Sequence, residues 1–365
     1  MISMSVALAI GFARMLLSAG WPPIRADSKG NGASMAKAGD GGGKAMTMED
    51  LAALAGVSTI TVSRALRGSD LVRESVRERI KQLAAEHGYR LNAAARSLRT
   101  RRANSITVAI EMDHTTDRPL TEPLVLIAVG ALLQEFAQRG YRLVLTTRSE
   151  ALSSNVQDTE GLILLGLGPN DEAIPQMQRF DLPLVVWGSS RPASGKVVFL
   201  GSDNLAGGCL VGEHLAALGR RRILFLGDSV HSEVADRLTG LNAAVAGHDV
   251  TVLQVACPFG REPARAAVEA ELARGTRFDA VVACSDPMAL GAIDQLQAAG
   301  LAVPGDVAVT GYDDITREPH LTSVRQDLNL AGQIMAELMF GLLEGHPVES
   351  RKLGVELIVR SSTQG

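Results

Sequence analysis

The spacing of apolar residues changes once along the chain, near residue 104. Between residues 47 and 89, apolar side chains recur at the three- and four-residue spacing of short amphipathic helices. From residue 105 onward, short continuous apolar runs alternate with longer helical stretches. This pattern predicts a small all-α domain followed by a larger α/β domain.

Three short helices are predicted in the first region. Thr47 and Asp50 have the spacing of a reciprocal N-terminal cap, and Gly56 ends that first helix in a tight turn. Ser58 is placed to cap the second helix. The apolar side of these two helices is expected to comprise Leu51, Ala52, Leu54, Ala55, Val62 and Leu66. Two short helices around one glycine turn predict a helix-turn-helix.

The third helix is expected to begin at Ser75, with Glu78 completing a capping box, and to stop at Gly88. Its inner side would carry Val76, Ile80 and Leu83. The residues of the second helix expected to face outward are Thr59, Ile60, Ser63, Arg64 and Arg67. A polar and basic face at the start of such a helix is typical of reading the DNA major groove, and a three-helix module that binds protein is the alternative.

The second region predicts parallel sheets, because buried strands that alternate with helices need right-handed crossovers. The apolar runs are 106–112, 141–147, 161–167, 182–188, 221–227 and 278–284. We expect two lobes, residues 105–201 and 202–323, that face each other across a cleft. A strand at 354–360 after a helix at 328–343 implies that the chain crosses between the lobes more than twice.

Four segments follow from these patterns: an extension (1–46), a helix-turn-helix domain (47–91), a hinge helix with linker (92–104) and a two-lobed domain (105–365). The chain opens with an apolar run that resembles an export signal, but Arg14 interrupts it and no basic stretch precedes it. We therefore expect residues 1–46 to be a disordered extension, with Met35, Met46 or Met48 as the start of the working protein.

Charge is unevenly distributed along the chain. Residues 47–104 hold 11 basic and 6 acidic groups, whereas residues 105–365 hold 20 basic and 32 acidic groups. A basic head on an acidic body is expected where one end meets phosphate, although a charge imbalance can also be a solvated face.

The sequence shows no motif for redox chemistry, metal binding or catalysis. Cys209, Cys257 and Cys284 are odd in number and lack the spacing of a zinc site, which predicts reduced packing residues in a cytoplasmic protein. The stretch GLGPND lacks the third glycine of a dinucleotide turn, and no Walker sequence or serine elbow occurs. We therefore expect no cofactor, no metal and no enzyme activity. No run beyond the opening one approaches the roughly 18 apolar residues of a membrane span.

The runs AGVSTITVSRALRG and ESVRERIKQLAAEHGYRLNAAARSLRT resemble the N-terminal domain and hinge of the lactose-repressor (LacI/GalR) family. The resemblance implies that Thr59 and Ile60 occupy the two specificity positions and that Arg64 contacts a base. It places Thr47, Ser58, Thr61 and Ser63 near backbone phosphates, and Met48 and Arg67 among the remaining DNA contacts of this domain.

The hinge is implied by the same resemblance. Residues 92–99, NAAARSLR, are too short for a stable isolated helix and in the family become helical when two subunits meet on operator DNA. Leu98 stands at the position of a wedge that enters the minor groove, with Asn92 and Arg99 as further DNA contacts. This chain has Leu91 where the family commonly has proline. A plain basic linker is the alternative.

The resemblance continues through the body, which is also similar to periplasmic sugar-binding proteins. Ligands of open parallel sheets bind beyond the carboxyl ends of the strands, so residues that close each apolar run are candidates. By this rule the expected effector contacts are Asp113, Trp187, Asp203 and Asp286. The resemblance implies Arg237 as a further contact, because it matches a family arginine that faces the cleft. Asp313 and Asp314 are expected to form a turn, with one of them able to line the cleft.

Function follows as an expectation from these features. Residues 112–123 lack the aromatic pair common in the family, which favours a sugar or sugar phosphate over a purine-like ring as effector. We expect a homodimeric repressor, with a tetramer also allowed, whose affinity for double-stranded operator DNA changes when effector closes the lobes. The alternative is a sugar-binding receptor with no specific DNA target.

Overall fold

The computed structural model describes residues 46–66, 69–89, 103–111, 123–153, 158–189, 191–315 and 318–364. The chain divides into two compact units, residues 1–91 and 92–365. Five candidate residues lie outside the described part of the chain, as does nearly all of the expected extension and hinge: Arg67, Asn92, Leu98, Arg99 and Asp113.

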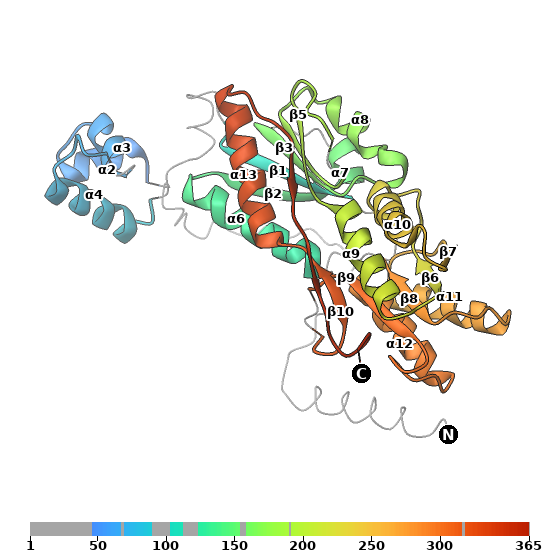
Figure 1. Ribbon diagram of the computed structural model, residues 1–365. Helices are drawn as coiled ribbons and strands as arrows, with labels where there is room; N and C mark the ends of the chain where they lie inside the picture. Colours follow the sequence, from blue (N-terminus) through green and yellow to red (C-terminus); the bar gives the residue numbers. More distant parts are fainter. Residues whose placement is uncertain are drawn as a thin grey trace, which may run out of the picture. The chain divides into compact units, whose positions relative to one another are not determined.

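The described part of the first unit contains three helices, α2 (Met48–Ala55), α3 (Thr59–Leu66) and α4 (Glu74–Glu86) (Figure 1). The predicted reciprocal cap is present, because the Asp50 amide donates to Thr47 Oγ1 at 3.2 Å and the Thr47 amide donates to Asp50 Oδ2 at 3.0 Å. Gly56 ends α2 with a φ of 68°, in the left-handed region that favours glycine. The Thr61 amide donates to Ser58 Oγ at 3.2 Å, so Ser58 caps α3 as expected.

A small apolar core joins the three helices. It consists of Leu51, Ala52, Ala55, Val62, Ala65, Val72, Ile80 and Ala84. Leu54 was expected on this inner side, but it is 47% exposed, because Leu51, Ala52 and Ala55 occupy the buried side of the short helix.

The predicted start of the third helix is wrong by one residue. The helix begins at Glu74, and its N-cap residue, Arg73, makes no side-chain capping hydrogen bond. Glu78 instead accepts a hydrogen bond from Lys81 at 2.8 Å, one turn along the helix. The Ser75–Glu78 capping box therefore does not form, because Ser75 already lies inside the helix.

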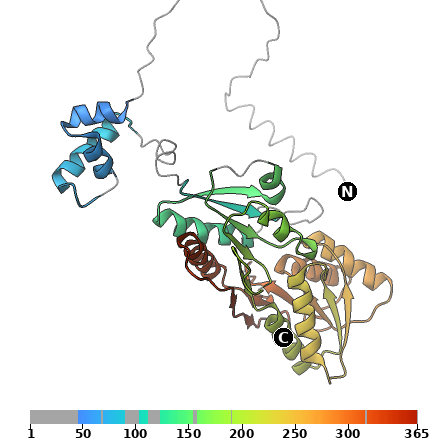
Figure 2. The ribbon, with the colours of Figure 1, turned by 90° about the horizontal axis from the view of Figure 1, so that it is seen from above.

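Two six-stranded sheets form the second unit, one in each lobe (Figures 1 and 2). The first sheet has the order β11-β5-β4-β3-β1-β2 and the second β12-β10-β9-β8-β6-β7. Neighbouring strands are parallel throughout, except that β12 runs antiparallel to β10. The strands are β1 (Ser105–Ile110), β2 (Arg142–Thr147), β3 (Gly161–Leu165), β4 (Leu184–Trp187), β5 (Val197–Ser202), β6 (Arg222–Leu226), β7 (Thr251–Val255), β8 (Ala280–Ala283), β9 (Ala308–Asp313), β10 (Thr322–Arg325), β11 (Arg351–Leu353) and β12 (Glu356–Ile358).

Helices cover both faces of the first sheet. Alternate residues of β3 point to opposite faces, so that Ile163 and Leu165 enter one core and Leu162 and Leu164 enter another. Figures 1 and 2 show α6 and α13 side by side along the first of these cores. The helices of this lobe are α6 (Pro123–Gln138), α7 (Arg148–Ser153), η1 (Pro169–Asp171), α8 (Ala173–Gln178) and α13 (Leu328–Glu344).

Glycines permit close contact of two helices in the second lobe. A Cβ on Gly208 would lie 2.0 Å from the Arg237 carbonyl oxygen, and one on Gly240 would lie 2.0 Å from the Leu205 carbonyl oxygen. The backbones of α9 and α10 can therefore touch directly, which fixes the position of Arg237 on α10. The helices of this lobe are α9 (Asn204–Ala217), α10 (Ser232–Val245), α11 (Arg261–Ala273) and α12 (Asp286–Ala298).

The chain crosses between the lobes three times, after β5, after β10 and after β11. This confirms the expectation of more than two crossings. Because α13 and β11 return to the first lobe, the two lobes are joined by three neighbouring segments rather than by one linker. None of the described helices is long and apolar enough to cross a membrane.

The core of the first unit supplies a prediction about its stability. Leu51 is 0% exposed, so Leu51→Ala should destabilise this unit by about 2–5 kcal/mol through lost burial and a residual cavity. Hydrogen exchange of the full-length protein, followed by mass spectrometry, should show faster exchange across residues 48–86 and unchanged exchange in the two lobes. Leu54→Ala, on the exposed side of the same helix, is the matched control. Equal exchange rates in both variants would contradict the proposed core.

Candidate functional site

The outward surface of α3 carries most of the predicted contact residues. Ile60 is 61% exposed, and Ser58 and Arg64 are exposed, while Thr59 and Thr61 are half-buried. Ser63 was expected on this surface but is only 4% exposed. The reason is that α3 packs against both α2 and α4, so more than one side of this short helix is covered and the small serine lies within that contact.

Arg64 differs from Arg77 of the first unit. The Arg77 guanidinium donates a hydrogen bond to Glu74 and lies 3.6 Å from Asp70. The Arg64 guanidinium has no hydrogen-bond or ion-pair partner among the residues that the structure describes, and the exposed side chain is open to an external acceptor. Thr47 and Met48 lie at the start of α2, both half-buried, with the Thr47 hydroxyl engaged in the cap.

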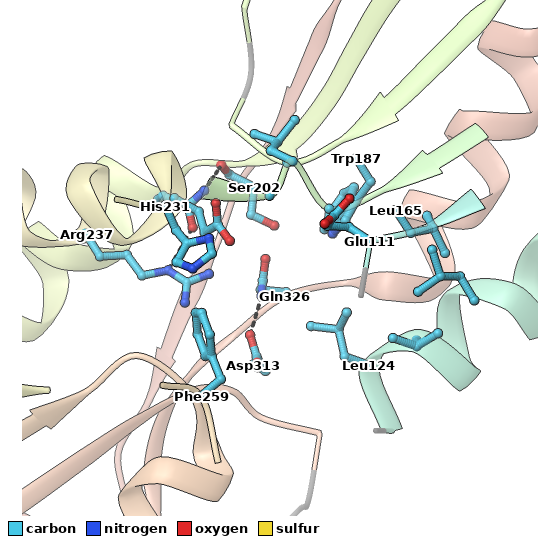
Figure 3. A pocket seen from close by; sticks show the side chains of 18 of the residues that line it. Glu111, Leu124, Leu165, Trp187, Ser202, His231, Arg237, Phe259, Asp313 and Gln326 are labelled. Atoms are coloured by element: carbon cyan, nitrogen blue, oxygen red, sulfur yellow. Dashed lines mark hydrogen bonds between the residues drawn. The ribbon is translucent and has the colours of Figure 1, made fainter. Parts of the chain in front are cut away.

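A cavity lies between the lobes of the second unit (Figure 3). The space between its lining residues, including the part that is open to solvent, amounts to about 960 Å³. The residues that line it are Ile110, Glu111, Leu124, Val125, Leu165, Gly166, Leu167, Gly168, Pro169, Trp187, Gly188, Ser202, Asn204, His231, Glu233, Arg237, Phe259, Asp313 and Gln326.

The ends of parallel strands build much of this wall. Glu111 directly follows β1, Trp187 ends β4, Ser202 ends β5 and Asp313 ends β9. The expectation that the site lies beyond the carboxyl ends of the strands is met by this cavity. Two aromatic side chains enter it from different lobes, Trp187 from the first and Phe259 from the second (Figure 3).

Arg237 is a cavity residue whose guanidinium is largely held by the protein. The side chain is 6% exposed; Nε donates to Asn204 Oδ1 at 2.9 Å and Nη1 donates to the Cys284 carbonyl at 2.6 Å. Its guanidinium carbon lies 3.5 Å from the centre of the Tyr312 ring. Burial acts to lower the pKa of Arg237, but nearby acidic groups, with Tyr312 and Asp313 foremost, raise it overall. Burial also raises the pKa of Tyr312 to about 12.

Two predicted effector contacts do not line the cavity. Asp286 is 1% exposed, and its carboxylate accepts hydrogen bonds from the Ser323 hydroxyl and, at 3.1 Å, from the Ile315 amide. Its position after β8 is one expected of a ligand-binding residue, but its side chain points toward Ser323 in β10 and Ile315 after β9. Asp203 caps α9 by accepting from the Ala206 amide at 3.0 Å.

Several cavity residues were missed in the sequence. Glu111 could have been found, because it follows β1 directly, two positions before the chosen Asp113. Its carboxylate is paired with Arg148, which donates to it from two guanidinium nitrogens. His231, Glu233 and Phe259 come from a helix start and a loop, where no strand-end rule applies. Asp313 lines the cavity, in agreement with the expectation that one residue of the GYDD turn can do so.

Direct contacts join the lobes beside the cavity. The Asn170 amide donates to the Val230 carbonyl at 2.9 Å, and the Ser232 hydroxyl donates to Asp171 Oδ1 at 2.9 Å. The Ser189 hydroxyl donates to Asp236 Oδ2 at 2.9 Å. We call these three contacts the lobe latch. Asn170 and Asp171 both have a positive φ, 51° and 57°, a strained backbone held in place by these contacts.

The cysteines lie apart from this cavity wall. Cys257 and Cys284 are buried and Cys209 is half-buried, all three as free thiols. Burial raises the pKa of Cys257 to about 11, which keeps it protonated and unreactive. Within the described ranges, no group of three or more His, Cys, Asp or Glu side chains could hold a metal ion.

Family models match both units. Residues 47–92 match the model of bacterial regulatory proteins of the lacI family, and residues 213–363 match a periplasmic binding protein-like domain. The HTH-type transcriptional regulator CelR of Thermobifida fusca is 37% identical over 341 residues, which cover 87% of this chain and 98% of that protein. The ribose operon repressor of Escherichia coli (strain K12) is 27% identical over 323 residues, covering 84% of this chain and 96% of that protein.

Solved structures with similar folds include regulators with DNA or ligand bound. A lac repressor dimer bound to operator and the anti-inducer ONPF matches with a TM-score of 0.75 and 25% identity, over 88% of this chain and 100% of that chain. A complex of the transcriptional regulator CelR with cellobiose matches with a TM-score of 0.63 and 31% identity, over 87% of this chain and 99% of that chain. The chain therefore belongs to the lacI family of bacterial regulatory proteins and is a DNA-binding transcriptional regulator.

Proposed function

We propose that this regulator is a repressor whose affinity for operator DNA is controlled by a sugar bound between its two lobes. The observation that carries the proposal is the interlobe cavity, which combines apolar ring surfaces with hydrogen-bonding groups from both lobes. Among the relatives, one structure is a complex of CelR with cellobiose, and one protein is named ribose operon repressor. We propose a cytoplasmic location and no catalytic role.

The DNA contact is assigned to the start of α3. Recognition helices of this type insert into the major groove with their first residues at the base edges. Ile60, 61% exposed, offers an apolar side chain for a thymine methyl group, and Thr59 lies beside it. Arg64 offers a guanidinium that can donate two hydrogen bonds to O6 and N7 of guanine. Thr47, Met48, Ser58 and Thr61 are proposed as neighbours of the backbone phosphates.

Ser63 is proposed to have a structural role. Because it is 4% exposed, it is assigned to the packing of α3 rather than to direct DNA contact. Arg67, Asn92, Leu98 and Arg99 remain proposed DNA contacts on the basis of their positions in the family motif, with Leu98 as the minor-groove wedge of each subunit in a homodimer. A tetramer would join two such dimers.

The cavity suits a sugar because sugar rings have apolar faces and polar edges. Trp187 and Phe259 can cover ring faces, while Glu111, Arg237 and Gln326 present acceptors or donors to hydroxyl groups. Asp113 stays a proposed contact from its position near the end of β1. Asp203 and Asp286 are assigned to the capping and loop contacts described above.

Control of DNA affinity requires that the effector bind two states of the protein unequally. A sugar that contacts both walls binds the closed arrangement of the lobes more tightly than an open one. The lobe latch stabilises the same closed arrangement, so the latch and the effector act on one equilibrium. The three segments that join the lobes would transmit this change toward the hinge.

Replacement of Arg64 tests the DNA proposal. In vitro selection from random duplexes should first give a partly palindromic operator for the full-length protein. Arg64→Ala should weaken binding to it by about 1–3 kcal/mol and relax one base position in each half-site. Arg79→Ala, which removes the same charge from the exposed face of α4, is the control and should leave base preference intact. Equal affinity of the unmodified protein for every duplex would refute specific reading.

Replacement of Ser189 tests the lobe latch. Ser189→Ala removes a hydrogen bond to a carboxylate, worth about 1.5–3 kcal/mol, which stabilises only the closed arrangement. Small-angle scattering of the full-length protein should show a larger radius of gyration, and hydrogen exchange should quicken in residues 230–236. Ser153→Ala, whose hydroxyl donates within its own helix, is the control. No change in either measurement would show that the latch does not hold the lobes.

A further inference from the structure

The cavity wall carries more carboxylates than permanent cations. Glu111, Glu233 and Asp313 line it, whereas Arg237 is the sole Arg or Lys among the lining residues that the structure describes. A ligand that enters the cavity therefore meets mainly hydrogen-bond acceptors. A carboxylate that already accepts hydrogen bonds within the protein is less available to the ligand than one that does not.

The charges of Glu111 and Arg237 are largely engaged within the protein. Arg148 donates to Glu111 from two nitrogens, and the Glu111 side chain is 8% exposed. Arg237 donates from Nε and Nη1 to Asn204 and Cys284, and its face covers Tyr312. An incoming phosphate would therefore find a guanidinium that already has acceptors, beside carboxylates that repel it.

Glu233 is different, because one of its oxygens has no internal donor. Glu233 Oε2 is buried and has no hydrogen-bond partner among the described residues, and the same holds for Ser202 Oγ. Both residues line the cavity. A buried carboxylate oxygen without a donor is costly, so a donor supplied by a ligand at this point contributes strongly to binding.

Glu233 and Arg237 are four residues apart on α10 and so share one face of that helix. Glu233 is also among the groups that raise the pKa of Arg237, so the two side chains balance each other electrostatically. A hydroxyl group beside them can donate to Glu233 and accept from a free N–H of Arg237. An ammonium group could donate to Glu233 but has no lone pair with which to accept from Arg237.

We propose that the cavity takes an uncharged polyhydroxyl ligand, that a ligand hydroxyl donates to Glu233 Oε2, and that Glu233 excludes phosphorylated and carboxylated sugars. This inference rests on the proposed function, since it presumes a sugar in the cavity. It selects one of the two classes that the sequence left open, the free sugar rather than the sugar phosphate. Ser202 Oγ is the second acceptor for the same ligand.

The test compares matched neutral and charged sugars on the full-length protein by isothermal titration calorimetry. The probes are ribose with ribose 5-phosphate, cellobiose with cellobiose 6-phosphate, and glucosamine. At least one neutral sugar should bind, and its phosphate should bind about a hundredfold or more weakly, because it adds repulsion to a lost hydrogen bond. Glucosamine should bind no more tightly than the neutral sugars.

Three variants separate the hydrogen bond from the charge. Glu233→Gln should weaken the binding of the neutral sugar about tenfold. It should also reduce the ratio of the affinity for the neutral sugar to the affinity for its phosphate to about tenfold or less. Glu233→Asp keeps the charge but shortens the side chain. It should therefore weaken the binding of the neutral sugar and still exclude the phosphate. Glu269→Gln makes the same charge change on the exposed face of α11 and should alter neither affinity. Thermal unfolding checks that each variant is folded.

The outcomes distinguish this inference from the function on which it rests. If a sugar phosphate binds the unmodified protein as tightly as its neutral sugar, or if glucosamine binds more tightly than the neutral sugars, the inference is wrong and the sugar effector stands. If a folded Glu233→Gln variant keeps the same preference for the neutral sugar over its phosphate, the inference is also wrong and the sugar effector stands. If none of the five probes binds, the proposed sugar effector fails, and the inference fails with it.

Discussion

The burial of the Arg237 guanidinium constrains the whole effector lobe. A buried cation is tolerated only when neighbouring groups compensate its lost hydration. Here the compensation comes from three elements: Asn204 at the start of α9, the Cys284 carbonyl after β8, and the Tyr312 ring in β9. These contacts require α9 and α10 to touch, which Gly208 and Gly240 permit. One side chain thus fixes the relation of two helices and two strands at the mouth of the cavity.

The same arrangement links ligand binding to motion of the lobes. Arg237 and Glu233 lie on α10, and the first turns of α10 also carry Ser232 and Asp236, which make the lobe latch with the first lobe. A ligand that orders the cavity face of α10 therefore acts on the helix that already joins the lobes. Because three chain segments connect the lobes, the lobes can move relative to each other only by bending at these segments and cannot rotate freely.

Much of this architecture could be predicted from local sequence rules, because each rule depends on neighbours along the chain. The cap of α2 by Thr47 and Asp50, the turn at Gly56 and the parallel strands all follow from spacing alone. Trp187 was correctly expected to lie at the cavity for the same reason, since it ends a buried strand. The expected contacts that lie away from the cavity depend on distant partners. Asp286 has a favourable position along the chain, but Ser323 on another strand determines where its carboxylate points.

Other misses show the limits of single-helix reasoning. Leu54 and Ser63 were assigned to the wrong side of their helices, because an eight-residue helix with two neighbours has no single boundary between inside and outside. Glu233 could not be found by any strand-end rule, since it lies near the start of helix α10. Its unpartnered oxygen is a property of the three-dimensional packing, which no spacing of residues reveals.

The distribution of charge gives the two units opposite preferences for anions. Residues 47–104 have an excess of basic groups, and residues 105–365 have 32 acidic against 20 basic groups. The basic unit is attracted to the phosphates of DNA, whereas the acidic body is repelled by them. The carboxylates of the cavity continue this preference into the ligand site, where a phosphorylated metabolite would meet the same repulsion. In the proposal that the effector is an uncharged sugar, this repulsion would separate the effector from phosphorylated metabolites irrespective of their shape.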